Sequence, residues 1–140
     1  MQLGGFTVLL QVFDMPTSLA FYRDVLGFTV ADDVPGDGRC DFAMLALNGS
    51  DLMLNTAYEA DDRPAALPDD RRRAHRDTAL FFDCADVDAA YARLIGRGVR
   101  VTPPAVQAYG MKQIYLEDPD GYELCLQQPA RYEPEAGRGA

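Results

Sequence analysis

The 140-residue chain is 48% apolar and 25% charged, which is typical of a globular protein of one domain. Its net charge of −9 argues against nucleic acid or an anionic membrane as partner, and no apolar run approaches the roughly 20 residues that cross a bilayer. Three cysteines without a C-x-x-C pair, and a start without a signal-peptide pattern, lead us to expect reduced thiols and a cytoplasmic protein.

The first half of the chain predicts the element order βαβββ. Residues 6–12 are β-rich, and the helix that follows should end at Gly27. Further strands are expected at 28–34, 40–47 and 51–56, with turns at Pro35-Gly-Asp-Gly and Asn48-Gly. The inner face of the helix is predicted to carry Leu19, Phe21, Tyr22, Val25 and Leu26.

The second half predicts the same order. A strand at 78–84 precedes a helix at 87–95, which should stop at Gly96 or Gly98. Strands at 99–102, 111–116 and 122–127 follow, with a loop through Pro103-Pro and a turn at Asp118-Pro-Asp-Gly. The inner face of this helix is predicted to carry Val87, Tyr91, Leu94 and Ile95.

A single offset of 72 residues relates the two halves. Asp14 and Asp86 each open a helix-like run, and Gly49 and Gly121 each open a short apolar strand. A duplicated unit suggests two similar sheets around a shared cavity. We therefore predict an α+β fold in which two βαβββ modules form a cup-shaped mixed sheet. One domain should span 1–128, with modules at about 5–56 and 78–128, a linker at 57–77 and a flexible tail at 129–140.

Strand alternation assigns side chains to the two faces of each sheet. If Leu52, Leu54, Leu124 and Leu126 turn to the helices, their neighbours turn to the cup. Apolar walls with a few amides and carboxylates suit a flat or amphipathic organic ligand, unless the side chains simply fill the cup. The predicted ligand-binding residues are Thr7, Leu9, Met53, Asn55, Ala79, Phe81, Gln113, Tyr115, Glu123 and Cys125.

Two motifs carry a resemblance to a known superfamily. They are Asp14-x-x-x-Ser18-Leu-x-Phe21-Tyr-x-x-x-Leu26-Gly-Phe and Asp118-Pro-Asp-Gly-Tyr-x-Leu-x-Leu-Gln127. In this order on a duplicated chain, they resemble the glyoxalase, bleomycin-resistance and extradiol-dioxygenase (vicinal oxygen chelate) superfamily over about residues 5–128. The resemblance implies a cup-shaped sheet around a cavity, commonly in a homodimer.

The resemblance also implies where metal ligands would lie, and the residues there are Thr7, Met53, Ala79 and Cys125. None is a good ligand for a hard or borderline divalent ion, so we expect neither a bound metal nor another cofactor. A shifted set of residues on the same strand faces would instead offer oxygen ligands for Mg²⁺ or Mn²⁺ from Gln11, Asp51, Asp83 and Glu123.

The leading functional hypothesis is a metal-independent protein that binds a small organic ligand, cationic or aromatic, as the antibiotic-sequestering members of the superfamily do. The first alternative is a metal-dependent enzyme, either a lyase or isomerase like glyoxalase I or an extradiol dioxygenase. The second is a metal-free enzyme with Glu123 or Asp83 as general base. His75, the only histidine, is expected to be a solvated loop residue, or a general base if the linker folds over the cavity.

Overall fold

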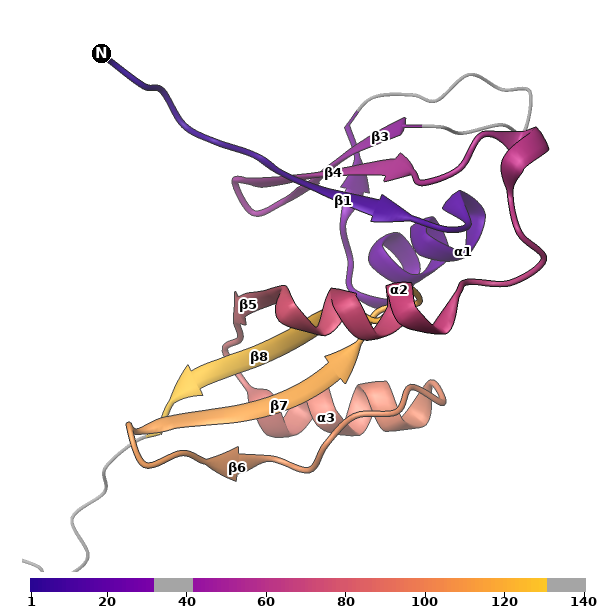
Figure 1. Ribbon diagram of the computed structural model, residues 1–140. Coiled ribbons are helices and arrows are strands. Elements are labelled where there is room, and N and C mark those ends of the chain that lie inside the picture. Colours follow the sequence, from indigo (N-terminus) through magenta and orange to yellow (C-terminus); the bar gives the residue numbers. More distant parts are fainter. Residues whose placement is uncertain (32–41, 131–140) are drawn as a thin grey trace, which may run out of the picture. The chain divides into compact units, whose positions relative to one another are not determined.

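The computed structural model describes residues 1–31 and 42–130, which fall into two compact units. The first unit comprises Met1–Arg76 and Asp118–Tyr122, and the second comprises Asp77–Glu117 and the residues from Glu123 onward. Each unit contains one mixed sheet of four strands with helical segments (Figure 1). In the described part of the chain, no helix is long and apolar enough to cross a membrane.

The first sheet has the strand order β1-β4-β3-β2, with β1 parallel to β4 and the other pairs antiparallel. In the predicted tight turn between β3 and β4, Asn48 and Gly49 have φ angles of 47° and 86°, as a type I′ hairpin requires. The predicted turn at Pro35, and the predicted strand residues 32–34 and 40–41, lie outside the described residues. The four strands are β1 (Val8–Val12), β2 (Thr29–Val30), β3 (Phe42–Leu47) and β4 (Ser50–Thr56).

The helix after β1 begins at Asp14, whose carboxylate accepts a hydrogen bond from the backbone N–H of Thr17 at 3.1 Å. It runs as α1 (Met15–Leu19) and then widens into the π-helical turn η1 (Ala20–Val25). As predicted, the helix ends at Gly27, which has a φ of 92°.

The inner face of this helix differs in part from the predicted one. Tyr22 is fully buried, and Met15 and Ser18 are buried beside it. The prediction assumed 3.6 residues per turn, a period that the wider π turn does not keep. The predicted inner residues that are only partly buried are Leu19, Phe21, Val25 and Leu26.

The second sheet has the strand order β5-β8-β7-β6, again with its first two strands parallel. Its helix α3 (Val87–Gly96) begins at Asp86, whose carboxylate accepts a hydrogen bond from Ala89 N–H at 3.0 Å. Leu94 is buried as predicted, but Ile95 is 47% exposed, because it lies about 100° further round the helix. The strands are β5 (Ala79–Asp83), β6 (Ala105–Val106), β7 (Met111–Glu117) and β8 (Glu123–Pro129).

The predicted strand at 99–102 is wrong. Of those residues only Val101 forms a bridge, to Leu116, and the strand that pairs with β7 on the side away from β8 is β6. Prolines cannot donate to a ladder, so regular pairing begins only after Pro103-Pro. Strand β8 extends to Pro129, the first residue of the predicted tail, and residues 131–140 lie outside the described residues.

The 72-residue repeat reappears in the strand register. Val8 pairs with Leu52 in the first sheet, and Leu80 pairs with Leu124 in the second, so the parallel pairs match at an offset of 72. Strands β3 and β7 correspond at an offset of 71 instead, since Met44 faces Met53 in the first sheet as Tyr115 faces Cys125 in the second. The chain therefore forms two modules of the same βαβββ design.

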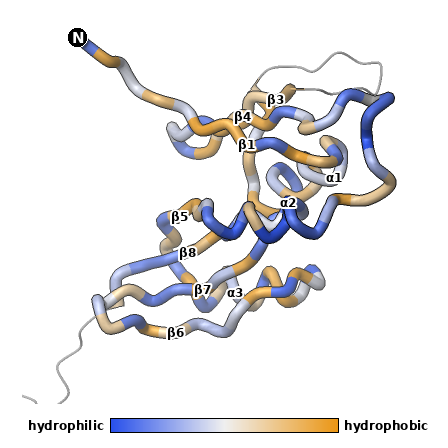
Figure 2. Tube along the Cα trace, in the orientation of Figure 1, coloured by the Kyte–Doolittle hydropathy of each residue, from blue (hydrophilic) through white to orange (hydrophobic). Residues whose placement is uncertain are grey.

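The predicted linker is not a plain loop. It contains η2 (Ala60–Asp62), α2 (Asp69–Ala74) and η3 (His75–Asp77), and Figure 2 shows α2 as a strongly hydrophilic helix. Pro68 precedes two aspartates in the first turn of α2 and three arginines in its last turn. This charge order stabilises a helix through its dipole, and it is the signal that an interpretation based on apolar periodicity missed.

The Asp118-Pro-Asp-Gly turn places two carboxylates inside the first unit. Asp118 is 2% exposed and accepts hydrogen bonds from Tyr22 Oη at 2.7 Å and from the backbone N–H groups of Asp120 and Tyr122. Asp120 is 1% exposed and accepts from Phe13 N–H at 2.7 Å and from a buried serine hydroxyl on α1. Burial raises the pKa of Asp118 to about 6 and also raises the pKa of Asp120.

The same turn holds α2 and the only histidine. Arg72 Nη2 donates to the carbonyl of Pro119 at 2.7 Å, and His75 Nδ1 lies 2.7 Å from the carbonyl of Asp120. The His75 ring stacks on Tyr122 with centroids 4.0 Å apart. His75 is therefore a half-buried packing residue, and the prediction of a solvated loop histidine is wrong. A Cβ on Gly121 would lie 2.7 Å from the carbonyl oxygen of Arg72, so only glycine permits this approach.

Because Gly49 and Gly121 are equivalent in the repeat, they provide a matched pair of variants that tests the close approach of α2 to Gly121. Gly49→Ala should cost about 1 kcal/mol, because a positive φ strains alanine but nothing lies within 4 Å of the added methyl group. Gly121→Ala should cost roughly 1–3 kcal/mol more, because its methyl group also meets backbone atoms of Arg72. Urea unfolding of both variants measures the difference. Equal losses would contradict the close packing of α2 on the turn.

Asp118 should make stability depend on pH. Its folded pKa of about 6 exceeds the unfolded value of about 3.9, so the folded protein holds the proton more tightly. Stability should therefore fall as pH rises from about 4 to about 6, by up to about 3 kcal/mol from this group. Urea unfolding at several pH values should show that Asp118→Asn loses correspondingly less stability over this window. The same pH dependence in both proteins would refute the assignment.

Candidate functional site

Each sheet has one largely buried face and one more open face, although two residues of the second open face, Gln113 and Cys125, are buried. In the first sheet Leu10, Leu52 and Leu54 are buried, and the intervening residues of β1 and β4 point the other way. In the second sheet Leu124 and Ile114 are buried in the same manner. The predicted site residues that share the open face of the first sheet are Leu9, Met53 and Asn55, while Thr7 lies just before β1; those of the second sheet are Ala79, Phe81, Gln113, Tyr115, Glu123 and Cys125.

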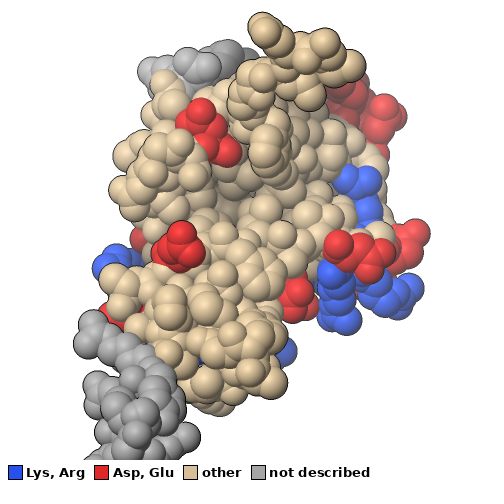
Figure 3. Space-filling view, turned by 90° about the vertical axis from the view of Figure 1, so that its left-hand side faces the viewer, with Lys and Arg blue, Asp and Glu red and all other residues tan. Residues whose placement is uncertain are grey.

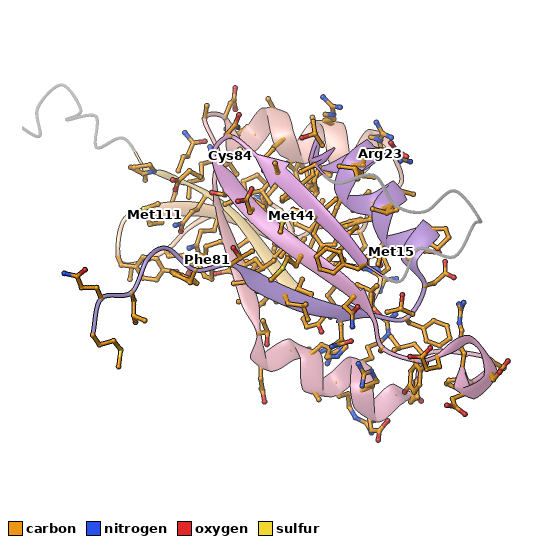
Figure 4. The ribbon with its side chains drawn as sticks, turned by 90° about the horizontal axis from the view of Figure 1, so that it is seen from above. Met15, Arg23, Met44, Phe81, Cys84 and Met111 are labelled. Atoms are coloured by element: carbon orange, nitrogen blue, oxygen red, sulfur yellow. The ribbon has the colours of Figure 1, made fainter. Side chains whose placement is uncertain are left out.

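Strand register orders the first open face into rows that run across the strands. Leu9, Met53 and Met44 form one row, which we call the thioether row. Two residues further along β1 lies an amide row, in which Gln11 stands beside Asn55. On the other side of Asn55, the neighbour on β3 in this row is Phe42, which is 39% exposed. Met44 is labelled in Figure 4. The face thus offers an apolar surface bordered by hydrogen-bonding groups.

The second open face repeats these rows with different side chains. An aromatic row of Phe81, Cys125 and Tyr115 corresponds to the thioether row. Phe81, labelled in Figure 4, is 55% exposed and meets the Tyr115 ring edge to face at 6.5 Å between centroids. The amide row of this face contains Gln127 and Gln113, and Asp83 stands beside Gln127.

Four polar side chains of the second face form one hydrogen-bonded cluster. Gln113 is 1% exposed, and its Oε1 accepts from Tyr115 Oη at 2.7 Å and from Tyr109 Oη at 2.9 Å. Its Nε2 donates to Gln127 Oε1 at 2.8 Å. The predicted site residues did not include Tyr109 or Gln127. Tyr109 lies in the turn before β7, where the alternation of strand faces predicts no side-chain direction. The pairing of Gln113 with Gln127 can be recognised only once the register of β7 and β8 is known.

Burial also sets the acidity of the aromatic row. Desolvation raises the pKa of Tyr115, and the neighbouring Tyr109 hydroxyl and Cys125 thiol add to this shift. Desolvation likewise raises the pKa of Cys125, which is fully buried. At neutral pH both groups keep their protons, so this row is uncharged.

The four positions implied for metal ligands do not fit a divalent ion. Thr7 and Ala79 are exposed, and alanine has no donor atom. Met53 offers only a soft thioether, and the raised pKa of Cys125 disfavours the thiolate that a metal requires. Among residues 1–31 and 42–130, no group of three or more His, Cys, Asp or Glu side chains is placed to hold a metal ion.

The shifted set of oxygen ligands is not brought together either. In the first sheet Gln11 stands opposite Asn55, whereas Asp51 is four residues back along the same strand, which is roughly 13 Å. In the second sheet Asp83 stands opposite Gln127, with Glu123 again four residues back. Neither pair can therefore contact one ion.

Two βαβββ modules of similar size define an α+β protein of the glyoxalase type. The model of the Glyoxalase/Bleomycin resistance protein/Dioxygenase superfamily matches residues 6–126, and the chain belongs to this superfamily. It is 32% identical over 115 residues to the protein YaeR of Escherichia coli K12, with 81% of this chain and 86% of that protein covered.

Solved structures share the fold. TnmS3, an antibiotic binding protein from Streptomyces sp. CB03234, is 28% identical with a TM-score of 0.68, and the match covers 93% of this chain and 99% of that one. A lactoylglutathione lyase from Agrobacterium tumefaciens is 19% identical with a TM-score of 0.64, covering 89% of this chain and 92% of that one. The second likeness concerns the fold alone. The chain is thus similar in sequence and fold to a binding protein, and in fold alone to an enzyme.

Proposed function

We propose that the protein binds a small organic ligand without a metal ion and without chemical change, as antibiotic-sequestering proteins do. The observation that carries the proposal is the composition of the two open faces. Each has an apolar or aromatic row beside an amide row, while the positions implied for metal ligands are Thr7, Met53, Ala79 and Cys125. Apolar area can supply affinity and the amides orientation, with no electrophile to drive a reaction.

The similarity to an antibiotic binding protein supports this class of function. The net charge of the protein narrows the class of ligand further, because a chain with a net charge of −9 attracts cations and does not repel neutral molecules. Figure 3 shows basic side chains beside acidic ones, with much of the visible surface uncharged. A flat aromatic compound, neutral or cationic, is the ligand that these features favour.

Two further properties belong to the proposal. The free cysteines Cys84 and Cys125 fit a reducing compartment, which for this chain would be the cytoplasm. The second property is a homodimeric state, which the family resemblance implies.

The enzyme alternatives have less support. A lyase or dioxygenase mechanism requires a metal, and the residues at the implied ligand positions are poor donors for it. A metal-free enzyme would rely on Glu123 or Asp83 alone, because four residues of strand separate the two carboxylates.

Ligand binding should raise the melting temperature. A ligand at 100 times its dissociation constant adds about 2.7 kcal/mol, or about 10 °C for a protein of this size. We expect a planar aromatic or cationic antibiotic to produce such a shift in thermal unfolding. Phe81→Ala should abolish the shift, and Ile95→Ala should preserve it, since both side chains are about half exposed but only Phe81 belongs to the aromatic row. An unmoved melting temperature across the panel at millimolar concentration would exclude sequestration of these compounds.

Chelation should leave the protein unchanged. We expect protein purified without chelator to contain no stoichiometric Mn, Fe or Zn by elemental analysis, and EDTA to alter neither the melting temperature nor the ligand-induced shift. The reason is the poor donor set at the four implied positions. A stoichiometric metal, together with turnover of a hemithioacetal or a catechol that EDTA abolishes, would establish the enzyme instead.

A further inference from the structure

In the polar cluster on the second open face, the side-chain amide oxygens of Gln113 and Gln127 already accept hydrogen bonds from within the cluster. Both lone pairs of Gln113 Oε1 are taken by the two tyrosine hydroxyls, and Gln127 Oε1 accepts from Gln113 Nε2. The amide hydrogens of Gln127 Nε2 remain, and within the described residues no acceptor binds them. Gln127 is only half-buried, so these hydrogens form the accessible end of the cluster.

From this we infer that Gln127 is a specificity-determining donor, which selects neutral planar ligands that carry a carbonyl oxygen at the ring edge. The inference rests on the proposed function and names its ligand class. An amide group held by Gln113, which is itself fixed by two tyrosines, is already oriented before a ligand arrives. Its N–H groups donate a hydrogen bond to a ligand that carries an acceptor. Beneath a ligand that has no acceptor, these N–H groups are left unpaired.

Row spacing sets the minimum size of the ligand. Residues two apart on a strand are about 6.6 Å apart, so a ring resting on Phe81 and Tyr115 has its centre about that far from the Gln127 row. A single six-membered ring is too short to rest on the aromatic row and also present an oxygen to Gln127. Two fused rings with the carbonyl at one edge span the distance.

The carboxylate of Asp83 sets the charge of the ligand. Asp83 is exposed and stands directly opposite Gln127 in the parallel pair of β5 and β8. An anionic acceptor, such as a carboxylate, would meet this like charge, whereas a neutral carbonyl would not. The pair therefore favours a carbonyl over a carboxylate at the same place.

Small probes test the donor directly. Coumarin is bicyclic and neutral with a carbonyl acceptor, and indole is of similar size but offers an N–H donor. We expect coumarin to bind wild type about fivefold more tightly than indole in an NMR titration that follows the Gln127 side-chain amide. Gln127→Glu, which replaces the donor with an oxygen, should remove that preference. Gln128→Glu is the matched control, because it keeps the oxygen that accepts from Val87 N–H and lies on the opposite face.

Coumarin-3-carboxylate tests the part played by charge. It should bind wild type more weakly than coumarin, and Asp83→Asn should narrow that gap several-fold. Equal affinity for coumarin and indole, no perturbation by either probe, or an unchanged preference in Gln127→Glu would overturn the inference. If antibiotics still raise the melting temperature in that case, the binding function stands and only the donor assignment fails.

Discussion

The burial of two carboxylates in one four-residue turn is the constraint on which the first unit depends. A carboxylate removed from water must be hydrogen-bonded, or it costs several kcal/mol. Asp118 and Asp120 meet this need with a tyrosine hydroxyl, a serine hydroxyl and backbone N–H groups from the end of β1 and from the turn itself. These donors come from separate segments, so the helix after β1 and the turn must be in place together. Its Pro119 carbonyl accepts a hydrogen bond from Arg72 of α2, and its Asp120 carbonyl and the following Tyr122 ring contact His75, which comes directly after α2.

The duplication preserves backbone pairing while the side chains diverge. The parallel strands of both sheets keep the same register, so each row of one open face has a counterpart on the other. The thioether row of the first face corresponds to the aromatic row of the second, and the pair of Gln11 and Asn55 corresponds to the pair of Asp83 and Gln127. Met side chains adapt to the shape of a ligand, whereas aromatic rings held by hydrogen bonds are rigid. The two faces therefore offer different kinds of surface on one backbone design.

Local chemistry was enough to predict much of this fold. The helix starts at Asp14 and Asp86, the turn at Asn48-Gly49 and the alternating faces of the strands depend on neighbours in sequence, and the sequence contains those neighbours. The failures depend on distant partners. The position of β6 is set by pairing with β7, and the place of His75 by a turn about 45 residues away. At the candidate site, alternation assigned Gln113 and Tyr115 to the correct face, but the pairing of Gln113 with Gln127 follows only from the register, and the contact with Tyr109 depends on the turn before β7.

The hydrogen-bonded cluster and the poor metal donors support the same view of the candidate site. A chelated metal recognises oxygen atoms by strong, short-range attraction, and a face with poor metal donors must discriminate by other means. Neutral hydrogen bonds are individually weak, so they discriminate well only when both partners are held still. Gln113 lies 1% exposed beneath two phenol hydroxyls, which fixes its amide and, through it, that of Gln127. Rigid placement of an uncharged donor is thus the means of ligand selection that we propose for this face.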